Sequence, residues 1–200
     1  MGEKGGMIAA MSKEQFSELM LLAGFGIWVV YGFLAGMGRW PAAVACGLIA
    51  GIALVLLEAG RHIEIKLLDW TVVAYFALAA IATFLLRANT FPLYSPIVIW
   101  TLYAGVSWTS LLVGAPFSLQ YARESVPPEH WSHPEFLAAN RTISLVWSAA
   151  FTVNIALVSL AVVPYFKSLL LAVGAPLLMM ASCAVFTSRY KKIARQRTLG

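Results

Sequence analysis

Residues 41–57 read Pro-Ala-Ala-Val-Ala-Cys-Gly-Leu-Ile-Ala-Gly-Ile-Ala-Leu-Val-Leu-Leu and contain no charged residue. A helix of about 20 predominantly apolar residues crosses the hydrocarbon core of a bilayer. Further stretches of this character occur at about residues 19–37, 70–86, 93–117, 142–163 and 168–186. The sequence therefore predicts an all-α, polytopic membrane protein with six transmembrane helices, in one membrane domain that spans residues 1–200.

The composition agrees with this class of protein. Hydrophobic residues make up 60% of the chain and charged residues 12%, and the mean hydropathy is +0.80. Soluble domains carry about 25% charged residues, so a soluble fold of this size would lack polar surface. We expect the first apolar stretch to remain in the mature protein as a signal anchor. Cys46 and Cys183 lie inside apolar stretches, and we expect two buried thiols rather than a disulfide or a metal cluster.

The distribution of charge predicts the orientation. With six spans, one side of the membrane carries 11 Lys and Arg residues and all nine acidic residues, and the other side carries three basic residues. The positive-inside rule places the first side, with both termini, in the cytoplasm. A five-span arrangement, with one short re-entrant stretch, would separate the termini and break this asymmetry. The chain is expected to cross its membrane several times.

Aromatic side chains are expected at both interfaces, where their amphipathic rings suit the headgroup level. At the outer interface we place Trp40, Phe91, Tyr94 and Tyr165, and at the inner one Trp70, Tyr121, Trp131, Trp147 and Tyr190.

Two glycine pairs predict close helix packing. Gly32 and Gly36 share the first span, and Gly47 and Gly51 share the second, each four residues apart. Small residues at this spacing let helix backbones approach each other. We expect the first two spans to form a tight hairpin that touches at Gly32 and Gly47. The alternative is that one of the pairs mediates a homodimer.

Helix starts and a weak repeat are also visible. Ser12 with Gln15, and Ser132 with Glu135, have the spacing of capping boxes. Gly-Ala-Pro occurs at residues 114–116 and again at 174–176, which hints at two halves of three spans each.

Polar residues concentrate at the predicted cytoplasmic face. We expect these residues to form a network of salt bridges that closes this face, including an ion pair between Lys66 and Asp69 at the start of the third span. The alternative is an anion or lipid-headgroup site built by Arg123, Arg141 and Arg61, because the donors of arginine form a planar fork that suits phosphate and carboxylate. The full set of candidate ligand- or partner-binding residues is Arg61, Lys66, Asp69, Gln120, Tyr121, Arg123, Glu124, Trp131, Asn140 and Arg141.

Catalysis and metal binding have weaker signals. His130 and His133, flanked by Glu129 and Glu135, lack the regular spacing of a zinc site. An enzyme that uses Glu124, Glu129 or the histidines is a third hypothesis, and we expect neither catalytic residues nor a cofactor or metal. No ionisable residue lies at mid-depth, which argues against a proton-coupled transporter. Asn154 is the strongest internal polar group, and we expect it to make hydrogen bonds between helices.

A family resemblance rests on short motifs between the second and fifth spans. They are Arg61 followed by Ile65-Lys66-Leu67-Leu68-Asp69, then Pro116-Phe-x-x-Gln120-Tyr-Ala-Arg123, then Trp131 and Pro134, and finally Asn140-Arg141 and Trp147. This arrangement resembles bacterial intracellular septation protein A-like inner-membrane proteins. The resemblance implies a role in the cell envelope or in division, and no catalytic residues. The chain departs from the pattern in a longer insertion between Arg123 and Asn140 and in a basic C-terminal tail.

We therefore expect a non-enzymatic inner-membrane protein of the cell envelope that acts through lipids or envelope proteins, with septation as the process that the resemblance implies. The expected contacts are with membrane lipids, with anionic headgroups at the basic tail, and with a second copy in the homodimer alternative, and nucleic acid is not expected. The other hypothesis is a transporter or channel for a small solute, ion or lipid, with an arginine-rich cytoplasmic site.

Overall fold

The computed structural model describes residues 13–61, 64–124, 126–162 and 170–199, and these segments are helical apart from short connections. The chain divides into two compact units, residues 1–89 and residues 90–200. Each unit contains three long helices, and each is described below by itself. The predicted cap at Ser12, the interfacial Tyr165 and the predicted start of the last span at Ser168 lie outside the described residues.

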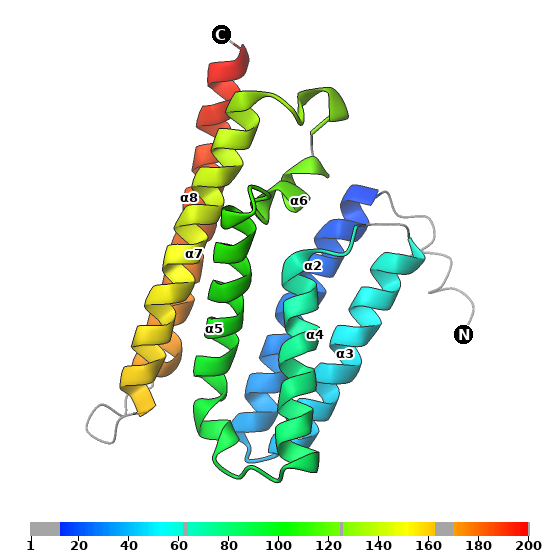
Figure 1. Cartoon of the computed structure of the whole chain (residues 1–200). Coiled ribbons are helices and arrows are strands. Elements are labelled where there is room, and N and C mark those ends of the chain that lie inside the picture. Colours follow the sequence, from blue (N-terminus) through cyan, green and yellow to red (C-terminus); the bar gives the residue numbers. More distant parts are fainter. Residues whose placement is uncertain (1–12, 62–63, 125, 163–169, 200) are drawn as a thin grey trace. The chain divides into compact units, whose positions relative to one another are not determined.

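The first unit is a bundle of α2 (Lys13–Gly36), α3 (Trp40–Gly60) and α4 (Leu67–Ala80), and α4 continues as the π-helical turn η1 (Ile81–Leu85). The middle helix α3 packs against both α2 and α4 (Figure 1). Between α2 and α3 the chain turns at Gly38, whose φ of +74° favours glycine. Pro41 follows at the start of α3, where its missing N–H costs no helical hydrogen bond. The predicted hairpin of the first two helices is thus confirmed.

The predicted glycine contact within this hairpin is wrong. A Cβ added at Gly32 or Gly36 would meet nothing within 4 Å, so neither glycine marks a close approach of helices. Gly47 instead faces the ring of Phe76 on α4, which occupies the space that a Cβ would need, and Gly51 faces Val72 and Val73. The second glycine pair therefore serves the α3–α4 interface, because the Phe76 ring fills the space that a side chain at position 47 would need.

Aromatic rings form the centre of the first unit. The rings of Trp28 and Tyr31 from α2 lie 5.5 Å and 6.0 Å from that of Tyr75 on α4, between centroids. The hydroxyl oxygens of Tyr31 and Tyr75 are 2.6 Å apart and share a hydrogen bond. Trp40 donates its indole N–H to Thr83 Oγ1 over 2.8 Å. Buried Tyr hydroxyls and Trp N–H groups need such partners, and here helices of the same unit supply them.

The second unit is built from α5 (Phe91–Leu112), α7 (Pro134–Val162) and α8 (Ala175–Leu199), with the π-helical turn η4 (Leu170–Gly174) leading into α8. The long helix α7 packs against both α5 and α8 (Figure 1). The connection from α5 to α7 contains the short helix α6 (Ser118–Arg123) and the 3₁₀ turn η2 (Pro128–His130). Tyr103 on α5 stacks on Phe151 of α7 at 5.3 Å between ring centroids.

In the described part of the chain, five helices are long and apolar enough to cross a membrane: Trp40–Gly60, Leu67–Leu85, Phe91–Leu112, Pro134–Val162 and Leu170–Lys191. The apolar half of α2, Gly26–Gly36, is shorter than a full span. These elements confirm an all-α, polytopic membrane protein. Five of the predicted stretches coincide with full-length spans, and the first coincides with α2.

Three local predictions need correction. The fourth span ends at Leu112 rather than at residue 117, because the chain turns at Gly114 with a φ of +75°. The helix predicted to be capped by Ser132 begins at Pro134, and the carbonyl of His133 accepts the first helical hydrogen bond from Leu137 N–H. Proline at the first helical position sets that start. The second Gly-Ala-Pro lies at the junction of η4 and α8, so the two copies take different conformations.

Candidate functional site

A buried ion pair lies where the first unit passes from α3 to α4. Lys66 Nζ is 3.6 Å from Glu58 Oε1, and the two side chains are only 5% and 1% exposed. Glu58 is buried because α3 continues to Gly60, so it falls on the same helix face as buried Leu54. The sequence predicted Asp69 as the partner of Lys66. The structure brings Glu58 to it instead, while the backbone N–H of Asp69 donates to the Lys66 carbonyl in the first turn of α4.

Arg61 lies between Glu58 and Lys66 in the sequence. It follows the last residue of α3, and its guanidinium carbon lies 4.7 Å from the centroid of the Phe16 ring of α2. The ring itself is 1% exposed, whereas Arg61 is half-buried. Arginine over an aromatic face gains a cation–π attraction. The arginine is therefore held in place at the end of the first unit.

In the second unit, buried hydrogen bonds fix α6 against α7. Ser118 Oγ lies 2.8 Å from the Asn140 carbonyl and 3.0 Å from its side-chain Oδ1, and the Ser118 backbone N–H donates to Ser144 Oγ. Asn140 Nδ2 donates to the Phe136 carbonyl over 2.9 Å. Asn140 is 3% exposed. Its bonds account for its burial, and they place the residues that follow Ser118.

Arg123 and Trp131 meet in the connection that α6 begins. The Arg123 guanidinium carbon lies 5.1 Å from the centroid of the Trp131 ring, and the indole N–H donates to the Val126 carbonyl over 2.9 Å. Arg123 Nε is buried and has no hydrogen-bond partner among the described residues. The pair therefore holds a positive charge in a fixed orientation.

The other candidates surround this pair in sequence. Gln120 and Tyr121 are half-buried on α6, whereas Glu124 and Arg141 are exposed. Arg61, Lys66 and Asp69 belong to the first unit, and Arg123 and Arg141 to the second. One site that combines the three arginines therefore stays a prediction.

The buried side-chain amide of Asn154, in the second unit, does not make the hydrogen bond predicted from the sequence. Asn154 on α7 is 0% exposed, and within the described segments neither Oδ1 nor Nδ2 has a hydrogen-bond partner. The buried serines Ser107 and Ser148 donate to carbonyls of their own helices, Ala104 and Ser144 respectively. Bonds between helices do occur nearby, where Trp108 Nε1 donates to Thr152 Oγ1. The expected interhelical hydrogen bond of Asn154 is missing from that network.

Other expectations concern reactive residues. In the part of the chain that the structure describes, no three His, Cys, Asp or Glu residues gather as metal ligands, although the rings of His130 and His133 lie 5.3 Å apart. Cys183 is buried as predicted, but Cys46 is exposed.

Two residues of these contacts, Phe16 and Glu58, were not predicted from the sequence. Phe16 was not considered because nothing in the local pattern signals a ring that receives an arginine about 45 positions away. Glu58 was not considered because the predicted second span ends at Leu57. The period of small and apolar residues at 47, 51, 54 and 58 would have continued the helix face through Glu58.

Comparison of the chain with known protein families, curated proteins and solved structures finds no match. The resemblance to septation protein A-like proteins therefore stays a prediction from the motifs.

Proposed function

We propose that the protein is a non-enzymatic, multi-pass protein of a bacterial inner membrane that acts by binding anionic phospholipid headgroups at its cytoplasmic face. The observation that carries the proposal is Arg123, which is stacked on Trp131 and has a buried Nε without a partner among the described residues. A guanidinium held in a fixed orientation suits a phosphate group. Trp131 suits the headgroup level of a bilayer.

Charge around Arg123 supports a role for the C-terminal tail in this binding. In the segment from Arg123 to Arg141, the charges of these two arginines are offset by three glutamates, Glu124, Glu129 and Glu135. The tail adds five basic residues on the side of the membrane that the charge distribution predicts to be cytoplasmic. Polybasic segments beside a span attract anionic lipid. Binding thus combines a general attraction by the tail with an oriented contact at Arg123. The motifs shared with septation protein A-like proteins make division of the cell the process that we propose for it.

A thermal unfolding experiment in detergent tests this function. A ligand that binds only the folded protein raises the melting temperature as its concentration rises. We expect phosphatidylglycerol to raise it, phosphatidylcholine with the same chains to raise it less, and Arg123→Gln to remove the difference. Arg39→Gln, which changes an exposed arginine between α2 and α3 that is not a candidate binding residue, is the matched control. Equal effects of both lipids on the unaltered protein would contradict the proposal.

A second candidate function is transport of a small polar solute, and Asn154 favours it. A buried amide without hydrogen bonds is costly, and π-helical turns such as η1 and η4 occur often at functional sites. Proteoliposomes that contain the protein would then show a solute flux that Asn154→Leu abolishes. A panel of ions and small metabolites without any flux would remove this candidate.

A further inference from the structure

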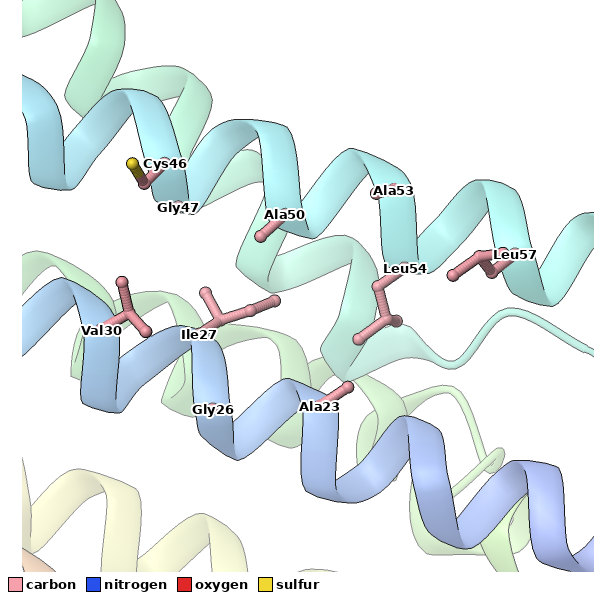
Figure 2. A pocket seen from close by; sticks show the side chains of 10 residues that line it. All are labelled: Ala23, Gly26, Ile27, Val30, Cys46, Gly47, Ala50, Ala53, Leu54 and Leu57. Atoms are coloured by element: carbon pink, nitrogen blue, oxygen red, sulfur yellow. The ribbon is translucent and has the colours of Figure 1, made fainter. Parts of the chain in front are cut away.

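An apolar groove runs along the first unit between α2 and α3. It has a volume of about 380 Å³ and extends from Val30 and Cys46 at one end to Ala23 and Leu57 at the other. Figure 2 shows the side chains of Ile27, Val30, Ala50 and Leu54 in the space between the two ribbons. The lining carries a single heteroatom among its side chains, the sulfur of Cys46 (Figure 2).

The dimensions of the groove match one acyl chain. Its wall on α3 spans residues 46–57, which corresponds to about 16 Å at about 1.5 Å per residue. This length is close to one leaflet, half of a hydrocarbon core about 30 Å thick. The volume of 380 Å³ over that length gives a mean cross-section of roughly 24 Å², whereas a helix about 10 Å wide has a cross-section of about 80 Å². The groove is thus too narrow to enclose a helix.

The groove leads to a positive charge. Arg61 follows Leu57 by four residues and continues the groove-lining stripe of α3, and Phe16 precedes Ala23 by two turns on α2. The Arg61 guanidinium over the Phe16 ring, 4.7 Å from its centroid, therefore lies beyond the Leu57 end of the groove. This end faces the cytoplasm in the predicted topology. The groove is apolar and as deep as one leaflet, and a cation lies beyond its Leu57 end. These two features match the acyl chain and the headgroup phosphate of a phospholipid.

We infer that this groove binds one acyl chain of an anionic phospholipid of the cytoplasmic leaflet, with the headgroup phosphate at Arg61. The inference deepens the proposed function, since it supplies a chain-binding site for the same class of ligand. It rests on residues of the first unit alone, so it fails independently of Arg123.

Native mass spectrometry of the full chain in detergent, with added phosphatidylglycerol, tests the inference. Ala50→Phe fills the groove and removes dispersion contacts with the chain. We expect about tenfold less retained lipid, a change of about 1.4 kcal/mol. Ala23→Phe fills the groove from α2 and gives a second variant in case the first does not fold. Ala74→Phe, which alters an exposed alanine of α4, is the matched control and should retain lipid as the unaltered protein does.

The headgroup is tested in the same spectra. Arg61→Gln should lower retention of phosphatidylglycerol and leave phosphatidylcholine unchanged, and inorganic phosphate alone should not bind. Binding of inorganic phosphate without lipid would show that Arg61 binds a free anion rather than a lipid headgroup, and it would overturn the inference. It would also be overturned if both groove-filling variants kept their lipid, or if they converted a dimer to a monomer without changing lipid retention. The last result would identify a second copy of the chain as the occupant.

Discussion

Lys66 Nζ lies 3.6 Å from Glu58 Oε1, and both side chains are almost completely buried at the junction of α3 and α4. Burial of two charges carries a large desolvation cost, which their mutual attraction only partly offsets. Removal of one partner leaves the other charge buried without its counterion. The junction is therefore sensitive to single changes and tolerant of paired ones.

Lys66→Met should lower the free energy of unfolding by about 3 kcal/mol, in the range for broken buried ion pairs. The double variant Glu58→Leu with Lys66→Met should recover most of that loss. Reversible unfolding in mixed micelles measures both, with Glu64→Gln as an exposed control in the same connection. A double variant less stable than Lys66→Met would show that the pair is not the source of the effect.

Gly47 should not tolerate a methyl group, because the Phe76 ring occupies the place of its Cβ. Gly47→Ala should cost about 1–3 kcal/mol, as overpacked cores do, and Phe76→Leu in the same chain should relieve part of the cost. Gly32→Ala meets open space and serves as the control. The same unfolding measurement decides, and equal effects of the two glycine substitutions would rule out the α3–α4 contact.

Two asparagines of α7 should respond in opposite directions to the same substitution. Asn140→Leu removes the bonds to Ser118 and Phe136 and should destabilise the protein by about 2 kcal/mol. Asn154→Leu removes a buried amide that has no partner among the described residues, and should raise the melting temperature. Thermal unfolding of both variants under one condition makes the comparison. Destabilisation by both would mean that Asn154 makes bonds in the folded protein.

The predicted topology has a direct test with a membrane-impermeant maleimide. In a background with Cys46→Ala and Cys183→Ala, a cysteine introduced by Arg87→Cys should react from outside intact cells. A cysteine introduced by Ser132→Cys should react only after permeabilisation. Both residues are exposed in connections between helices. Labelling of both in intact cells would contradict the orientation predicted from charge.

The sequence predicted the helices well because apolar length is a local property. The apolar stretch 41–57 predicted the C-terminal end of α3 to within three residues. Because the predicted helix stopped before Glu58, the burial of Glu58 was not predicted. Contacts between helices were harder to predict, because the sequence around Gly47 is compatible with a contact to α2 or to α4. The ring of Phe76 decides that question, and its position depends on the packing of the whole unit.

The candidate site was predictable in its residue types and unpredictable in its pairs. Arg61 and Arg123 were identified from the scarcity of charge, but the rings beneath them, Phe16 and Trp131, lie at separations set by tertiary structure. Asn140 appeared as a binding residue because it is polar and near the interface. Its bonds to Ser118 show a structural use that a helix sequence does not encode.

The most direct test of the central claim is native mass spectrometry of the protein extracted from its membrane without added lipid, with identification of what remains bound. The account predicts retained anionic phospholipid, reduced by Arg123→Gln or Arg61→Gln and nearly absent when both arginines are replaced. Retention of zwitterionic and anionic lipids in proportion to their abundance, unchanged by these substitutions, would contradict it.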